Sequence, residues 1–311
     1  MLCYHHPNNH FMIHRRSFIK YASLGLGALS LTQQKILNAF FEDPWKIKML
    51  RNDVGIFTER GGTIGFLLHK DGIIVIDTQF PDQSNNLIKE LKNRSDKPFK
   101  YLLNTHHHGD HSSGNISFKG LVENVVAHEN SKINQQKQAE RQNAMDKQLY
   151  PDTTFSNELK IKSGDIKLTA DYFGPAHTNG DALYLFEDAD IVHVGDLMFN
   201  RRHPFIDRSS GASIANWTQV LDKAVNKYGK KTIYIFGHAA EGYEVTGTAD
   251  DMMKFKEYLN RLLEFAQKEV KAGKTKEDFI KNTEIPGVTE WKGSGIERPL
   301  TAAYEEVISG A

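Results

Sequence analysis

One stretch of the chain concentrates the residue types that could do chemistry. It is Thr105-His106-His107-His108-Gly109-Asp110-His111, in which four histidines and one aspartate lie within six consecutive positions. Neutral imidazole and carboxylate are side chains that bind Zn²⁺ and other borderline divalent metals. The stretch is internal, follows an apolar segment (99–103) that reads as a strand, and precedes a polar turn (112–115). The pattern therefore predicts a metal site on a loop at a strand end, rather than a solvated histidine run.

Three more residues follow predicted strands in the same way. They are His177, Asp196 and His238. A single histidine or aspartate at a strand end is a weak indication of a metal ligand. The recurrence of such residues beside the six-residue cluster is what strengthens the interpretation.

Apolar runs separated by Gly, Pro and Asp turns predict the elements that must position these residues. The predicted strands are 54–57, 65–68, 73–78, 99–104, 122–128, the hairpin 158–173, 182–186, 190–194 and 231–236. The predicted helices are 85–94, an exposed helix within 129–157, 213–228, 248–270 and a short helix beginning at Thr275. Asp77 ends one strand and could either cap a turn or orient a metal-bound histidine. His128 is interpreted as an ordinary strand-end histidine.

Composition excludes several classes of function. Lys and Arg together number 39, as do Asp and Glu, so the charge gives no reason to expect nucleic acid as a partner. A hydrophobic content of 39% with a mean hydropathy of -0.51 fits a soluble globular protein. The only cysteine, Cys3, lies in a segment expected to be lost. The mature chain should therefore have no disulfide, no thiolate ligand and no cysteine nucleophile.

The N-terminus reads as an export signal. His14-Arg15-Arg16-Ser17-Phe18-Ile19-Lys20, followed by a short apolar run (21–31), resembles a bacterial twin-arginine signal. The apolar run is too short to favour a stable membrane span, although an uncleaved anchor or a buried helix is an alternative. We expect residues 1–40 to be a signal segment, with Met1 or Met12 as the initiator. The mature protein would then be periplasmic or secreted, with no stable membrane insertion after export.

Taken together, the motifs resemble those of the metallo-β-lactamase-fold superfamily. The matching residues are His106-x-His108-x-Asp110-His111, His177 after Gly-Pro-Ala, Asp196 in Val-Gly-Asp and His238 in Phe-Gly-His. The resemblance covers roughly residues 45 to 265. It implies an α/β fold, a four-layer αβ/βα sandwich of two mixed sheets flanked by helices, with the site at one edge. The expected organisation is a domain over 45–270 and a helical extension over 271–311 packed on it.

The resemblance also implies two divalent metal ions, with Zn²⁺ as the first expectation. By position, His106, His108 and His177 would hold one metal. Asp110, His111 and His238 would hold the other, and Asp196 would bridge them. Asp110 would also be catalytic, receiving or orienting a proton. His107 is treated as a structural neighbour that binds neither metal.

One departure from the antibiotic-degrading members bears on the substrate. Their best-known subclass has a cysteine at the second metal, whereas here Asp196 occupies the comparable strand end. A bridging carboxylate is more similar to the glyoxalase II and lactonase branches, and the 195–207 stretch resembles a group of secreted members. Asn200, Arg202 and His203 follow Asp196 and could either face a substrate or only pack in the loop.

The leading functional hypothesis is a hydrolase of small molecules. A metal-bound hydroxide would attack an ester, lactone, thioester or amide carbonyl, with β-lactamase side activity included. One alternative is a mononuclear iron dioxygenase of the same fold, and another is a non-catalytic metal-binding member. Phosphodiesterase or nuclease chemistry fits less well, because the chain has no basic tract. The sequence does not identify the substrate or the oligomeric state.

Overall fold

The computed structural model describes residues 44–310. The predicted export signal and Cys3 lie outside the described residues. Within the described part of the chain, no helix is long and apolar enough to cross a membrane.

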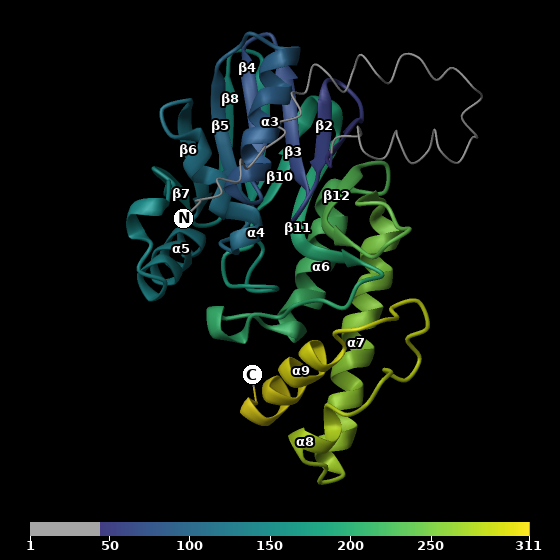
Figure 1. Ribbon diagram of the computed structural model, residues 1–311. Coiled ribbons are helices and arrows are strands. Elements are labelled where there is room, and N and C mark those ends of the chain that lie inside the picture. Colours follow the sequence, from purple (N-terminus) through teal and green to yellow (C-terminus); the bar gives the residue numbers. More distant parts are fainter. Residues whose placement is uncertain (1–43, 311) are drawn as a thin grey trace, which may run out of the picture. The chain divides into compact units, whose positions relative to one another are not determined.

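The strands of residues 44–310 form two mixed sheets (Figure 1). Sheet A has the order β1 (Lys46–Met49), β2 (Val54–Thr58), β3 (Ile64–His69), β4 (Gly72–Ile76), β5 (Phe99–Asn104), β6 (Val122–His128) and β7 (Thr153–Phe155). Sheet B has the order β13 (Thr246–Gly247), β12 (Ile233–Ala239), β11 (Ile191–Asn200), β10 (Leu183–Phe186), β9 (Ile166–Asp171) and β8 (Glu158–Ser163). The strands β4 to β7 are parallel to one another, as are β11 and β12, and the other pairs are antiparallel.

The two sheets pack face to face, and the side chains of their central strands are apolar on both faces of the sheet. In β4, Ile74 and Ile76 belong to the core between the sheets, and Ile73 and Val75 belong to the core on the outer face of sheet A. Side chains of a strand point alternately to opposite faces, so a continuous apolar run is buried on both sides. The strand therefore requires a helical layer outside the sheet.

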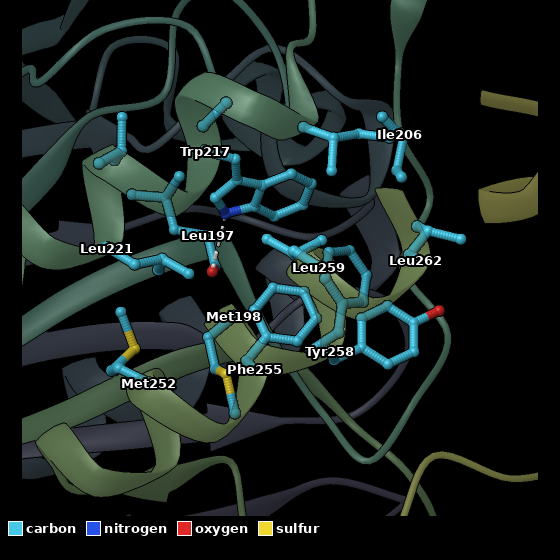
Figure 2. Close-up of a cluster of buried hydrophobic side chains, with 14 of the residues drawn as sticks. Leu197, Met198, Ile206, Trp217, Leu221, Met252, Phe255, Tyr258, Leu259 and Leu262 are labelled. Atoms are coloured by element: carbon cyan, nitrogen blue, oxygen red, sulfur yellow. Dashed lines mark hydrogen bonds between the residues drawn. The ribbon is translucent and has the colours of Figure 1, made fainter. Parts of the chain in front are cut away.

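Helices supply both outer layers. The helix α3 (Pro81–Arg94) covers sheet A with Leu87 and Leu91. The helices α6 (Ile214–Tyr228) and α7 (Ala249–Lys271) cover sheet B. Figure 2 shows this core, in which the Trp217 indole lies among side chains of β11 and α7 and donates a hydrogen bond to the Leu197 carbonyl at 3.2 Å. The resulting order of layers is helix, sheet, sheet, helix.

The C-terminal segment adds two helices to the outer layer of sheet B. They are α8 (Lys276–Phe279) and α9 (Glu297–Ser309), and α9 packs beside α7 (Figure 1). Glu306 of α9 is buried and accepts hydrogen bonds from the backbone N–H groups of Ile214 and Ala215 at 2.8 and 2.9 Å. A carboxylate at a helix N-terminus satisfies free N–H groups and interacts favourably with the helix dipole. The C-terminal helix is therefore tied to the start of α6.

The predicted fold class, a sandwich of two mixed sheets flanked by helices, is confirmed. Two predicted strand ends are wrong: β11 continues past Asp196 to Asn200, and β12 includes His238. The register of β11 against β12 is irregular around Gly195, whose φ is +52°, so the chain bulges there and then resumes pairing. The sequence interpretation predicted a helical extension over 271–311 without the bounds of α9, and it missed the short strands β1, β7 and β13.

Candidate active site

The loop after β5 brings the histidine cluster to the carboxyl-terminal edge of the parallel strands. The short helix α4 (Gly109–Ser112) begins inside the cluster, with His108 at its N-cap position. His106 and His111 are buried, and the His108 side chain is 14% exposed. The 106–111 segment is therefore a structured turn rather than a solvated run.

The first donor group consists of three imidazoles. His108 Nδ1 lies 3.0 Å from His106 Nε2 and 2.9 Å from His177 Nε2. His177 comes from the loop before β10, 69 residues further along the chain. One carboxylate oxygen of Asp196 lies near the group, 3.4 Å from His177 Nε2 and 3.8 Å from His106 Nε2. These four donor atoms lie within 4.8 Å of one another.

The far side of each imidazole fixes which nitrogen carries the proton. His177 Nδ1 donates to the Phe205 carbonyl at 2.8 Å, so Nε2 carries the lone pair in the neutral ring. His108 Nε2 donates to Asp207 Oδ2 at 3.0 Å, which leaves the lone pair on Nδ1. His106 Nδ1 donates to the hydroxyl oxygen of Thr105 at 3.0 Å. All three lone pairs then point at one another, an arrangement that repels itself unless a cation lies between them.

The second donor group mixes carboxylate and imidazole. His238 Nε2 lies 3.1 Å from Asp110 Oδ2 and 3.4 Å from His111 Nε2. His111 Nδ1 donates to Asp77 Oδ2 at 2.8 Å, so His111 Nε2 faces His238 and Asp110. The donor atoms of Asp110, His111 and His238 again lie within 4.8 Å of one another.

Asp196 lies between the two groups. Its Oδ2 is 3.4 Å from His177 and 3.5 Å from His238, while its Oδ1 is 3.0 Å from His111. The His111 nitrogen approaches Oδ1 in a direction that makes no hydrogen bond, so among the described residues this buried oxygen has no hydrogen-bond partner. A Cβ atom on Gly237 would lie 1.9 Å from Oδ1, which means that only glycine fits there. The carboxylate is therefore held between the groups by close packing.

Asp77 contacts both groups, the first through Thr105 and the second through His111. It is buried, and its Oδ1 accepts from the backbone N–H of Thr105 at 2.8 Å. Its Oδ2 accepts from the Thr105 hydroxyl at 2.7 Å and from His111 Nδ1 at 2.8 Å. Of the two roles that the sequence left open, the structure places this carboxylate in the one that orients a histidine. Because the Thr105 hydroxyl proton points to Asp77, Thr105 is free to accept from His106.

The two groups differ in their electrostatics. Burial holds the pKa of His106 well below its ordinary value and lowers the pKa of His177 to about 3, so both rings are neutral. Burial also disfavours charge on His111, but the carboxylates of Asp196, Asp110 and Asp77 outweigh it and raise the pKa of His111 well above its ordinary value. The pKa of His238 is raised for the same reason by Asp196 and Asp110.

The donor set fits divalent cations. Three converging lone pairs, an unpartnered buried carboxylate oxygen and a second cluster rich in negative charge are what such ions require. The three carboxylates that stabilise a proton on His111 would equally stabilise a metal cation. The imidazole and carboxylate donors suit zinc, and they also suit iron and manganese.

A cavity of about 490 Å³ is bounded on one side by donors of both groups, His108, Asp110, Asp196 and His238. Its other walls are formed by residues outside the donor set, which are Gly109, Phe199, Arg202, His203, Phe205, Ser294, Gly295 and Arg298. Two of the three residues expected to bind substrate line this cavity, and one does not. Arg202 and His203 line the cavity, whereas Asn200 does not: its amide donates to the Glu244 carbonyl at 2.8 Å.

Sequence reasoning missed the contribution of the C-terminal segment to this cavity. Ser294, Gly295 and Arg298 lie at and before the start of α9, more than 50 residues after His238. The Gly-Ser-Gly turn at 293–295 was a turn signal, but it carried no indication of where the turn would lie. Asp207 was also missed as a partner of His108.

Two further histidines considered in the sequence analysis, His107 and His128, lie outside both donor groups. His107 is buried, and its Nε2 lies 3.3 Å from the Ser210 hydroxyl and 3.6 Å from Asp207. Burial lowers the pKa of His107 to about 3. His128 caps the helix α5 (Glu129–Arg141) by accepting from the Asn130 N–H, and its ring stacks on Tyr172.

Comparisons with known proteins agree with the fold. The family model of the metallo-beta-lactamase superfamily matches residues 57–238. Metallo-beta-lactamase IND-1 of Chryseobacterium indologenes is 22% identical over 177 residues, 56% of this chain and 70% of that protein. The hydroxyacylglutathione hydrolase of Dictyostelium discoideum is 29% identical over 163 residues, 51% of this chain and 55% of that enzyme.

Two solved structures illustrate the shared architecture. A metallo-beta-lactamase from Pontibacter korlensis superposes with a TM-score of 0.57 at 19% identity, covering 70% of this chain and 99% of that one. A double mutant of the sec-alkyl sulfatase PisA1 superposes with a TM-score of 0.66 at 13% identity, covering 84% of this chain and 50% of that one. At such identities the likeness concerns the fold. The match of the family model over more than half of the chain, on the fold described above, means that the chain belongs to the metallo-beta-lactamase superfamily.

Proposed function

We propose that this protein is a dinuclear metal-dependent hydrolase that acts on the carbonyl group of a small ester, lactone, thioester or amide. One observation carries the proposal: seven donor side chains converge in two adjoining groups beside a cavity of about 490 Å³. His106, His108 and His177 would hold the first ion, and Asp110, His111 and His238 the second. Asp196 would touch both. We take zinc as the first candidate for both ions.

Two bound divalent cations would supply Lewis acidity, which lowers the pKa of water and polarises a carbonyl oxygen. Asp110 is the protein group best suited to move a proton. Its side chain is 32% exposed and lines the cavity. Burial acts to raise the pKa of Asp110, but His111 and His238 outweigh it and hold that pKa below its ordinary range. Asp110 Oδ2 is therefore an ionised acceptor at neutral pH.

The cavity wall favours a substrate with an anionic group. Arg202 and Arg298 are exposed, line the cavity and have no ion-pair partner among residues 44–310. The neighbouring Arg201, by contrast, is buried, pairs with Glu290 at 2.9 Å and lies over the Trp291 ring. Arg201 therefore anchors the loop, and Arg202 and Arg298 are free to bind a carboxylate, to which guanidinium groups are well matched.

The names of the two curated relatives, a metallo-beta-lactamase and a hydroxyacylglutathione hydrolase, support a hydrolase. The second donor group weighs against a mononuclear iron dioxygenase, because a single ion would leave Asp110, His111 and His238 without a role. A non-catalytic protein has no need of an ionised, partly exposed Asp110 beside the donors.

The test is metal analysis followed by turnover. Protein purified without added metal is assayed for zinc, iron and manganese, then stripped and reloaded. We expect near two ions per chain and activity on a panel of esters, lactones, thioesters and β-lactams. Asp110→Asn should bind the first ion and lose turnover. One iron per chain with no hydrolysis of the panel, or full hydrolysis by stripped protein, would overturn the proposal.

A further inference from the structure

A second cavity, of about 330 Å³, adjoins the one described above. His108 and Phe205 line both cavities, so the two spaces share a wall at the first donor group. Phe205 is 45% exposed, and its ring lies 5.4 Å from the His108 ring, measured between centroids. A substrate whose carbonyl lies beside the donors could therefore extend around Phe205 into the second cavity.

The second cavity is lined almost entirely by polar side chains. One wall is α5, and the opposite wall is the segment that follows Phe205. Besides His108 and Phe205, the lining residues are His107, Asn134, Lys137, Gln138, Arg141, Gln142, Asp207, Ser209 and Ser210. Hydroxyl, amide and cationic groups dominate the set, so the cavity is rich in hydrogen-bond donors.

Lys137 and Arg141 give this cavity its charge. They are four residues apart on α5, so they lie one turn apart on the same face of the helix. Like charges at this spacing destabilise a helix. Neither residue has an ion-pair partner within the described residues, whereas Arg208 has one and Arg261 has two. The two like charges of Lys137 and Arg141 are therefore unfavourable for the helix, and both residues line the cavity.

The one carboxylate in the lining does not neutralise these cations. Asp207 Oδ2 accepts from His108 Nε2 at 3.0 Å. Its Oδ1 accepts from the Ser209 hydroxyl at 2.6 Å and from the Ser210 N–H at 3.1 Å. Both oxygens are thus engaged on the loop side of the cavity, and no hydrogen bond joins Asp207 to either cation.

A buried polar atom in the same lining also lacks a partner. The His107 ring is only 5% exposed, and its Nδ1 has no hydrogen-bond partner among the described residues. Unpaired buried polar atoms are rare in native proteins, and they are often satisfied by a bound molecule. His107 lines the same cavity as Lys137 and Arg141.

We propose that this second cavity is an oxyanion subsite, in which Lys137 and Arg141 bind a carboxylate, sulfate or phosphate group carried by the substrate. The role of the subsite in substrate binding rests on the proposed hydrolase. The binding of an anion in this cavity does not, because it can be measured without a substrate. The inference predicts substrates with an acidic group on the far side of Phe205 from the scissile carbonyl. Lys137 and Arg141 then determine specificity and take no part in the chemical step.

The first test measures binding directly, with inorganic sulfate as the probe and the metal-loaded protein in the calorimeter. The variant Lys137→Gln/Arg141→Gln should bind sulfate at least about tenfold more weakly, as expected for losing charge-assisted hydrogen bonds. Lys132→Gln is the matched control, since Lys132 is on the same helix and does not line the cavity. It should bind as the unmodified protein does.

A second pair of variants separates the two cavities. If Arg202→Gln/Arg298→Gln abolishes sulfate binding while Lys137→Gln/Arg141→Gln leaves it unchanged, the anion belongs to the first cavity and the inference is wrong. The melting temperature of Lys137→Gln/Arg141→Gln should equal or exceed that of the unmodified protein, because a like-charge pair has been removed. A lower melting temperature would mean that the cations stabilise the fold, which contradicts the inference.

Kinetics then connect the subsite to the reaction. With an acidic substrate, Lys137→Gln/Arg141→Gln should raise KM about tenfold and leave kcat within about twofold, since uniform binding is lost. A neutral analogue should show no change in KM. If no substrate is turned over, the proposed hydrolase fails and the sulfate measurement alone decides the subsite. If turnover is normal but KM for the acidic substrate does not change, the subsite inference fails and the hydrolase stands.

Discussion

The two donor groups are built from similar side chains but differ in charge. In the first group, three imidazoles present lone pairs, and burial keeps His106 and His177 neutral. In the second group, carboxylates hold the pKa values of His111 and His238 above their ordinary range. The first group is thus pre-organised by the hydrogen bonds on the far side of each ring, and the second by charge.

The difference predicts separate tasks for the two groups in the proposed hydrolase. Neutral imidazoles would bind a cation without competition from protons. The second group is partly open, since the Asp110 side chain is 32% exposed, and a proton can occupy it. In the proposed hydrolase, this is the group that would exchange protons with a substrate in the cavity. The comparison therefore predicts that loss of either group abolishes turnover but leaves a different ion behind.

The largest effect is expected from removing one donor of each group. His177→Ala and Asp110→Asn should each lower the metal content by about one ion per chain, and turnover should fall on the order of 10³-fold in each. The ion retained by Asp110→Asn should have the spectrum of a three-histidine site when cobalt replaces zinc. Identical spectra for the two variants would mean that the groups do not bind separate ions.

Glycine substitutions test whether the groups are separable by packing. A Cβ on Gly237 would lie 1.9 Å from Asp196 Oδ1, and a Cβ on Gly62 would lie 2.1 Å from the His111 ring. Gly237→Ala should therefore weaken both ions, and Gly62→Ala should weaken only the second. Overpacking of this kind costs about 1–3 kcal/mol of unfolding free energy. Calorimetric titration with Zn²⁺ and urea unfolding measure the two effects, and two intact ions in Gly237→Ala would contradict the expectation.

The carboxylates behind the imidazoles should give intermediate effects. Asp77 contacts both groups, through Thr105 and through His111, whereas Asp207 contacts only His108 of the first. Loss of such a partner typically costs about 10- to 100-fold in metal affinity. Asp77→Asn should weaken both ions and Asp207→Asn only the first, as measured by competition with a chelating dye. If the two variants weakened both ions equally, Asp77 and Asp207 would not differ in the donor groups that they support.

A histidine outside both groups gives the smallest effect and a reference for acid sensitivity. Burial lowers the pKa of His128 from 6.5, against the Ser156 carbonyl and Glu129, which act to raise it. Below about pH 6.5 the unfolded chain therefore binds a proton that the folded chain refuses, so stability falls as the pH falls. His128→Gln should make the unfolding free energy of chelator-treated protein less dependent on pH between 7 and 5, by at most about one proton. An unchanged slope would mean that His128 does not contribute.

Much of the fold follows from local patterns. The continuous apolar run of β4 predicted a fully buried strand, and the apolar stripe of α7 predicted an amphipathic helix, because periods of 2 and 3.6 place side chains on defined faces. Short edge strands such as β7 and β13 were missed, because their pairing depends on partners rather than on their own sequence. A helical extension was predicted over 271–311, but the sequence did not predict that α9 would contribute Arg298 to the cavity.

The sequence by itself determined which residue types could bind metal and their order along the chain. Imidazole and carboxylate groups that recur at the ends of apolar strands predict a metal site. Only the tertiary structure decided which nitrogen of each ring faces the site. That choice depends on contacts such as His108 to Asp207 and His111 to Asp77, which join residues 99 and 34 positions apart. No local pattern encodes them, because they exist only after both sheets have packed.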